Sequence, residues 1–282
     1  MSRLCGLGWM AIRKVSKMND EKVAVGEFES WNQYSQFSHW VMKKARHLLD
    51  ARNQRFLDAV ILTSVRRKRI IKAGEGIWRA QLGCGWRTEK MLDENERETD
   101  SFLVRGPHSP ERMVPLSDCA YEGRVNPKGI PCIYFSTDSD TAMTETRPWI
   151  GSLVTVAQFV ILNNLTVVDC TATEPVDDWN LVFNFGPPEP ERREECVWGD
   201  INRAFSQPVD RIDNVAEYAP TQVLAEAFRM AGYDGIVYGS KLGTGKTVAV
   251  FDLAAAKVAN CQLCRVEGVS LAYSEESTVY PP

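Results

Sequence analysis

Apolar residues between positions 28 and 49 recur at intervals of three and four, which predicts an amphipathic helix. Ser30 and Gln33 stand at its start with the spacing of a capping box. A polar break separates this helix from a second apolar run over 56–65, which predicts another helix. We therefore expect an N-terminal helical segment over 27–74, folded as a helical hairpin.

The basic run over 66–69 follows the second apolar run directly. Because cations are favoured at the C-terminus of a helix, we interpret this run as a solvated helix end. After Gly74 and Gly76, a short apolar run over 77–80 predicts a strand. Residues 86–115 are polar, acidic and contain proline, which indicates a long loop, either disordered or a lid over a site.

The stretch from 121 to 148 predicts a loop, a strand and a helix in that order. Pro127 lacks a backbone donor and Gly129 permits positive φ, so this part of the stretch is not helical. Residues 130–136 form an apolar run of good strand formers. A capping side chain then precedes a predicted helix over 138–146. An arginine and a glutamate thereby flank one short strand.

Further apolar runs predict the helices and strands in the rest of the chain. Asn163 and Asn164 are expected to join two strands through a tight turn. Pro220 fits the first turn of a helix that ends at Gly232. The predicted strands cover 153–160, 165–168, 235–238, 247–253 and a candidate around 261–269, and helical pieces are expected at 176–184 and 191–205.

Composition and charge narrow the classes of function. The 282 residues, 44% hydrophobic and 25% charged, are ordinary for a globular protein. The net charge of −4 gives no electrostatic case for nucleic acid as the main partner. No stretch approaches the roughly 20 apolar residues of a membrane span. We therefore expect neither a nucleic acid nor a membrane as a partner.

The N-terminal residues and the cysteines indicate the cellular compartment in which the protein is expected to reside. Arg3 precedes an apolar run over 4–12, but this run contains glycines and no small-residue cleavage site follows, so 1–26 is expected to be a flexible leader. The eight cysteines are scattered through apolar segments, which predicts a reducing, cytoplasmic environment. No second pair or nearby histidine completes a zinc site around Cys261 and Cys264, so no metal is expected.

The segment Gly243-Thr244-Gly245-Lys246-Thr247 invites comparison with a phosphate-binding P-loop. Such a loop requires a glycine where Ser240 stands, and it must open a helix so that the helix amides face the phosphate. The residues that follow here alternate and are β-branched, which predicts a strand. We therefore interpret the segment as a hairpin turn.

Ordered blocks along the chain resemble the RES domain family, which is named for its Arg, Glu and Ser residues. The blocks are GIWRAQ at 76–81, the central stretch at 121–148, EYAPTQ at 217–222, GYDGIVYGS at 232–240 and VFD at 250–252. The resemblance implies a RES catalytic domain over 75–256 and a C-terminal extension over 257–282. It also implies an α+β fold with surrounding helices and a split β-sheet like that of ADP-ribosyltransferases.

The same resemblance assigns the catalytic residues. Arg79 and Arg124 occupy its two arginine positions and are expected to bind a pyrophosphate, for which a planar guanidinium is suited. Arg105 is a competing candidate for the first position. Glu145 takes the position of the catalytic carboxylate, and Ser240 takes that of the family's serine, where it is expected to orient the leaving group. Without the resemblance, the same residues are typical of a solvated surface and a turn.

The resemblance also assigns substrate-binding residues. Tyr134 is expected to stack on a nicotinamide or ribose ring, although a core tyrosine is the simpler interpretation. Tyr121 and Tyr238 are weaker candidates for the same role. Asn126 and Gln222 complete the predicted substrate-binding set, with a structural role as the alternative for Gln222.

Known RES members are toxins that destroy NAD⁺. The resemblance implies a glycohydrolase or phosphorylase that cleaves the nicotinamide–ribose bond of NAD⁺, as a toxin or defence effector. A protein ADP-ribosyltransferase using the same residues is the alternative, and a catalytically inactive binding module is a third. The implied partners are NAD⁺ as substrate with no further cofactor, inorganic phosphate as an acceptor, and an antitoxin or immunity protein; a homo-oligomer stays open. At Thr247 the chain departs from the family pattern, which has an asparagine there.

The N-terminal segment resembles helical segments that precede some RES domains and are related to the HEPN class. HEPN nucleases carry an arginine and a histidine a few residues apart on one helix. No arginine precedes His39 or His47 in that way. We therefore expect these helices to cover the catalytic domain rather than to carry nuclease chemistry.

Overall fold

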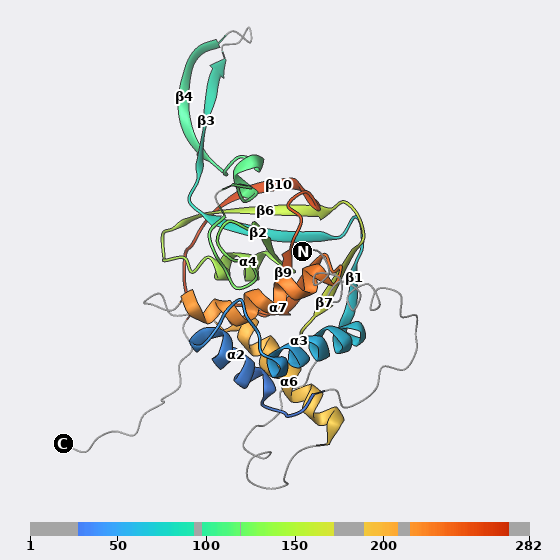
Figure 1. Ribbon diagram of the computed structural model, residues 1–282. Helices are drawn as coiled ribbons and strands as arrows, with labels where there is room; N and C mark the ends of the chain where they lie inside the picture. The colour runs from blue at the N-terminus through green and yellow to red at the C-terminus, as the bar shows by residue number, and fades with distance from the viewer. Residues whose placement is uncertain (1–27, 93–97, 119, 172–188, 208–214, 271–282) are drawn as a thin grey trace, which may run out of the picture.

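The computed structural model describes most of the chain (Figure 1). The predicted leader over 1–26 and the predicted helix over 176–184 lie outside the described residues. The fold is a mixed α+β arrangement of a mostly antiparallel sheet and several helices, as the sequence predicts. The described residues are 28–92, 98–118, 120–171, 189–207 and 215–270.

An eight-stranded sheet forms the centre of the molecule, in the order β1-β7-β8-β9-β5-β2-β6-β10. All neighbours pair antiparallel except β7 and β8, which are parallel. The strands are β1 (Lys68–Ile71), β2 (Gly76–Leu82), β5 (Ile133–Ser136), β6 (Leu153–Ile161), β7 (Leu165–Asp169), β8 (Gly235–Gly239), β9 (Lys246–Val250) and β10 (Ala256–Arg265).

The sheet is split between β2 and β5. These strands share one register pair, Trp78 with Ser136, whereas β2 pairs with β6 along its whole length. The sheet therefore consists of two halves, β10-β6-β2 and β5-β9-β8-β7-β1, that meet at a single point. A closer likeness to ADP-ribosyltransferases stays a prediction.

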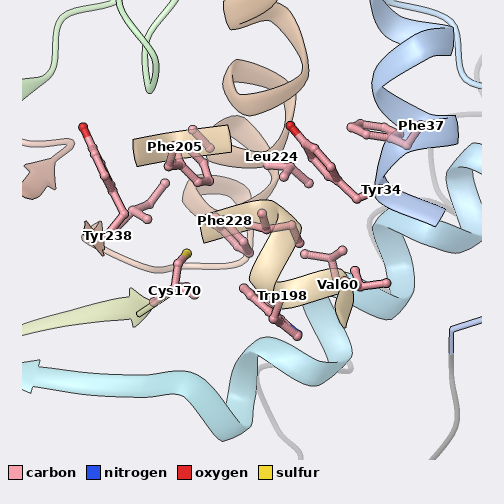
Figure 2. Packing of buried hydrophobic residues seen from close by; sticks show 14 of the residues in the cluster. Tyr34, Phe37, Val60, Cys170, Trp198, Phe205, Leu224, Phe228 and Tyr238 are labelled. Atoms are coloured by element: carbon pink, nitrogen blue, oxygen red, sulfur yellow. The ribbon is translucent and has the colours of Figure 1, made fainter. Parts of the chain in front are cut away.

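Helices cover one face of the sheet and share one core. Trp198 is fully buried, stacks on Phe228 at a centroid distance of 6.2 Å, and donates its indole N–H to the Thr63 hydroxyl at 3.0 Å. Figure 2 shows these aromatic side chains packed together with Tyr34 and Phe37 of the N-terminal segment. The helices are α2 (Gln33–Lys43), α3 (Ala51–Ser64), α6 (Pro190–Ser206) and α7 (Ala219–Met230).

A second apolar cluster covers other side chains of the same strands. Phe135 and Phe159 meet edge to face at 5.0 Å within it, and Met113 closes it with a fully buried side chain. In β5, β7, β8 and β9, successive residues lie in different clusters, which is the pattern of a sheet covered on both sides. The shorter helices are α4 (Ser139–Glu145) and the 3₁₀ turns η1 (Val65–Arg67), η2 (Pro110–Met113) and η3 (Val215–Tyr218).

The basic run over 66–69 is a solvated helix end only in part, because Arg66 and Lys68 are exposed whereas the other two arginines are half-buried. Arg67 stacks on the Trp198 ring at 4.6 Å, and Arg69 lies in β1, where it forms an ion pair with Asp169 at 3.3 Å. An edge strand needs few apolar residues, and only Ile71 of β1 is fully buried. The predicted N-terminal segment over 27–74 thus contributes a strand to the sheet; the domain boundaries stay predictions.

Two predicted loop connections also differ from the structure. Residues 86–115 contain a hairpin of β3 (Gly85–Leu92) and β4 (Glu98–Gly106), which projects from the body of the protein (Figure 1). The sequence shows no alternation of apolar and polar residues along this hairpin, because both of its faces carry polar residues. The strands on either side of Asn163 and Asn164 do not pair with each other, since β8, β9, β5 and β2 lie between them. The Asn164 side chain instead accepts from the backbone N–H of Ala73 at 2.9 Å.

Candidate active site

A cavity of about 270 Å³ lies where the two halves of the sheet meet. Five of the residues predicted for the site line it: Arg79, Arg124, Tyr134, Glu145 and Tyr238. The split accounts for the cavity, because strands that part after one register pair leave space between their side chains. The remaining lining residues are Trp78, Ala80, Gly123, Phe135, Ser136, Ala142, Thr146, Tyr218 and Thr247.

Two arginines with unused donors line this cavity. Arg79 reaches from β2 to the backbone carbonyl of Tyr134, to which its Nη1 donates at 3.0 Å. The buried Nε atoms of Arg79 and Arg124 have no hydrogen-bond partner among the described residues. Burial lowers the pKa of Arg79 to about 10, and the positive charge of Arg112 adds to this effect. An anionic group that entered the cavity would be attracted by both guanidinium groups.

Arg105, the competing candidate for the first arginine position, lies elsewhere. It belongs to β4 of the projecting hairpin, where its guanidinium stands over the Trp86 ring at 5.7 Å. It does not line the cavity. Of the two candidates, only Arg79 lies beside Arg124.

The loop that carries Arg124 is held from beneath by buried polar side chains. The Tyr134 hydroxyl donates to Asn126 Oδ1 at 2.7 Å and accepts from the backbone N–H of Val125 at 3.0 Å. Asn126 Nδ2 in turn donates to the carbonyls of Tyr121 and Ile130. These bonds fix the backbone on both sides of Arg124.

Gln222, in the first turns of α7, holds the same loop. Its Nε2 donates to the carbonyl of Gly123 at 2.9 Å and to that of Asn126 at 3.2 Å. Gly123 is needed for this packing, because a Cβ there would lie 2.6 Å from the Tyr134 hydroxyl. Asn126 and Gln222 thus lie behind the cavity wall and do not line it.

Replacing Gln222 by Met is expected to lower the free energy of unfolding by about 2 kcal/mol, because two buried backbone carbonyls lose their donor. Urea unfolding of the purified protein measures this change. Gln54→Met is the matched control: Gln54 is exposed on α3, so its replacement is expected to change stability by less than about 0.5 kcal/mol. Equal effects of the two substitutions would contradict a supporting role for Gln222.

The carboxylate of Glu145 is held by Ser240. The Ser240 hydroxyl donates to Glu145 Oε1 at 2.7 Å and accepts from the backbone N–H groups of Leu242 and Gly243, each at 3.1 Å. The hydroxyl is therefore fully engaged, and Ser240 does not line the cavity. Glu145 ends α4, and Asp138 caps the start of this helix by accepting from the Thr141 N–H at 2.7 Å.

The glycine-rich loop after Ser240 packs against α4. The backbone N–H of Gly245 donates to the Thr141 hydroxyl at 2.9 Å, and a Cβ on Gly245 would overlap the Asp138 carboxylate. The loop leads into β9 and not into a helix, so it lacks the helix amides of a P-loop, as the sequence predicts. Its glycines allow the close contact that brings Ser240 to Glu145.

A row of four paired residues crosses the sheet at the cavity. Tyr238 pairs with Thr247, Thr247 with Ser136, and Ser136 with Trp78 across the split. All four line the cavity. The Thr247 hydroxyl is buried without a partner among the described residues. The sequence did not single out Trp78 or Ser136, because their place in the row depends on the pairing of distant strands.

Tyr238 contacts both the apolar core and the cavity. Its ring stacks on Phe205 at 5.5 Å, as Figure 2 shows, while its hydroxyl end lies near Arg124 and Glu145. Burial raises the pKa of Tyr238, and the Arg124 charge opposes this rise. Tyr238 therefore stays a neutral phenol. Tyr121, by contrast, is 89% exposed and does not line the cavity.

The described residues contain no group of three or more His, Cys, Asp and Glu side chains that could hold a metal ion. Cys261 and Cys264 are free thiols on β10, and their spacing on a strand points them to opposite faces. In the same part of the chain, no helix combines the length and apolar character that crossing a membrane requires.

The family model described as "RES domain" matches residues 102–271, a range that includes Arg124, Glu145 and Ser240 but begins after Arg79. No protein of curated function matches the chain. A chain in the crystal structure of the M. tuberculosis MbcT–MbcA toxin–antitoxin complex is similar at 14% identity, with 73% of this chain and 92% of that chain covered and a TM-score of 0.36.

Proposed function

The chain belongs to the RES domain family, and from this premise we propose that it cleaves the nicotinamide–ribose bond of NAD⁺, with water or inorganic phosphate as the acceptor. The lining of the cavity is the observation that supports this proposal. A single cavity is lined both by two arginines with unused donors and by a glutamate that a serine holds in place. This combination suits a substrate with an anionic pyrophosphate and a sugar that becomes cationic during the reaction.

Arg79 and Arg124 are proposed to bind the pyrophosphate. Both guanidinium groups line the cavity, so phosphate oxygens would form charge-assisted hydrogen bonds with them. The supporting bonds of Asn126 and Gln222 keep the Arg124 loop in place before the substrate enters. The cavity is thus preorganised for an anion.

Glu145 is proposed to stabilise the transition state. Breaking the nicotinamide–ribose bond builds positive charge on the ribose, and a nearby carboxylate lowers the energy of that oxocarbenium-like state. Nicotinamide is cationic in NAD⁺ and leaves as a neutral molecule, so no general acid is needed. The bond from Ser240 orients the carboxylate, and the Tyr134 ring is proposed to stack on the nicotinamide or the ribose.

We also propose that NAD⁺ loss makes this protein a toxin or defence effector of the cytoplasm, restrained by an antitoxin or immunity protein. Family membership supports this role. Expression of the wild-type chain is expected to arrest growth and deplete cellular NAD⁺, whereas a Glu145→Gln chain expressed to the same level is not. Growth of wild-type cells with normal NAD⁺ and no partner present would count against the role.

The direct test mixes the purified chain with NAD⁺ and follows the release of nicotinamide, with and without inorganic phosphate. Release is expected, and its dependence on phosphate distinguishes phosphorolysis from hydrolysis. A parallel sample with adenine-labelled NAD⁺ and cell lysate tests the alternative, because only a protein ADP-ribosyltransferase leaves label on protein. Intact NAD⁺ in every sample would contradict the proposed function.

Replacing Thr247 by Val is expected to lower kcat/KM for NAD⁺ about tenfold, because the substrate loses one hydrogen bond in the cavity. The same substitution is expected to keep or raise the free energy of unfolding by about 1 kcal/mol, since it removes a buried hydroxyl that has no partner without substrate. Thr247→Ser should retain most of the activity. Thr166→Val on β7, outside the cavity, is the control for a threonine-to-valine change.

A further inference from the structure

The β3–β4 hairpin is a ribbon without a core of its own. It forms a separate two-stranded sheet and projects from the body of the protein (Figure 1). Trp86 and Leu103 lie on it with exposed fractions of 63% and 67%. An isolated two-stranded ribbon is only marginally stable in water, and three or more strands are normally needed. The hairpin therefore has the features of a sheet that is completed by another strand.

The outer edge of β3 is free to accept that strand. Neither strand of the ribbon pairs with a third one within the described ranges. Side chains alternate along β3, so Trp86, Thr88 and Lys90 share one face while Arg87 and Glu89 share the other. Arg87 and Glu89 already form an ion pair at 2.6 Å along the strand, and both are well exposed.

We propose that β3 pairs with β3 of a second copy of this chain, antiparallel across a twofold axis at Thr88. The result is a four-stranded sheet in which each copy supplies one hairpin. Such an interface is isologous, so each contact occurs twice. The hairpin projects away from the body, which leaves its edge accessible to a second copy (Figure 1).

Charge complementarity favours the β3–β3 register with the twofold axis at Thr88. With the axis at Thr88, Arg87 lies opposite Glu89 of the second copy, and the reverse contact is formed by symmetry. On the other face, Trp86 lies opposite Lys90 of the second copy, so the exposed indole ring is covered by the lysine side chain without a clash of like charges directly across the pair. An axis at Arg87 or at Glu89 would place like charges directly opposite each other, which destabilises a sheet.

The β4 edge offers no such match. Asp100 and Arg105 lie an odd number of residues apart, so their side chains point to opposite faces of the ribbon. Residues that pair across a twofold axis share a face, so these two charges cannot meet in a β4–β4 pair. Charge complementarity therefore favours β3 as the strand that joins the copies.

The test compares oligomeric state by light scattering and sedimentation for wild type, Arg87→Glu, Glu89→Arg and the double variant. Wild type is expected to form a dimer that weakens as salt rises. Each single reversal makes both symmetric contacts repulsive and is expected to weaken the dimer about tenfold or more. The double reversal restores opposite charges and should restore the dimer.

Mixing the two single variants gives a second, independent readout. One variant then presents two acidic side chains and the other two basic ones, so a heterodimer is expected although each variant alone dimerises at least about tenfold more weakly than wild type. An unchanged circular dichroism spectrum serves as the folding control, because neither residue belongs to an apolar core cluster. A monomeric wild type at its highest soluble concentration, or a double variant and a mixture that both stay monomeric, would overturn the proposal.

Discussion

Replacing Glu145 by Gln is expected to lower the rate of nicotinamide release from NAD⁺ about a thousandfold, with the dissociation constant for NAD⁺ changed by less than about threefold. Gln keeps the shape of the side chain and an oxygen that can accept from Ser240, so the bond at 2.7 Å has a substitute. What is lost is the negative charge that faces the developing cation on the ribose. The effect should therefore appear in kcat rather than in KM.

Two further variants separate this chemical role from simple damage to the site. Ser240→Ala keeps the charge but removes the bond that orients it, so a loss of about tenfold to thirtyfold is expected. Glu226→Gln removes an exposed carboxylate of α7 that lies outside the active-site cavity, and it should leave the rate unchanged. A Glu145→Gln enzyme with near wild-type turnover would remove Glu145 from the mechanism.

The sequence predicted the central stretch well because its structure is determined locally. The Pro127 and Gly129 loop, the strand that follows and the helix capped by Asp138 all depend on near neighbours in the chain. The observed bounds of β5 and α4 fall inside the predicted ranges of 130–136 and 138–146. Local signals of this kind require no knowledge of which strands pair.

Strand pairing was the part that the sequence could not supply. The residues of β6 and β7 are close in sequence and were expected to form a hairpin, but they belong to different halves of the sheet. The choice depends on whether the apolar face of each strand is buried better by a sequence neighbour or by a distant strand. Composition and periodicity do not contain that comparison.

In the candidate site, too, the sequence supplied some features and only the folded structure supplied the others. Family resemblance located Arg124, Glu145 and Ser240, and the structure brings Glu145 and Ser240 into contact across 95 positions. The resemblance did not distinguish the lining of the cavity from its support, so Asn126 and Gln222 were assigned to substrate although they hold a loop. Burial and hydrogen bonding make that distinction, and both are properties of the folded chain.

Replacing Arg124 by Met is expected to raise the KM for NAD⁺ about a hundredfold or more, because the pyrophosphate loses charge-assisted hydrogen bonds in a buried site. Arg124→Lys should recover little of this loss, since an ammonium group cannot offer the planar fork of a guanidinium. Steady-state kinetics of nicotinamide release measure both effects. Arg105→Met on the projecting hairpin is the matched control and should leave KM unchanged.

The free energy of unfolding of Arg124→Met distinguishes a substrate-binding role of Arg124 from a structural one. Its Nε atom has no partner among the described residues, and its other contact is a hydrogen bond with Tyr238, so Met in its place should change the free energy of unfolding by less than about 1 kcal/mol. A residue that holds the fold together would show the opposite, a loss of stability that matches the loss of activity. The wild-type chain should also gain thermal stability from added pyrophosphate, because both guanidinium groups that line the cavity attract that anion. This gain is expected to disappear in Arg124→Met, and an equal gain in both proteins would place the anion elsewhere.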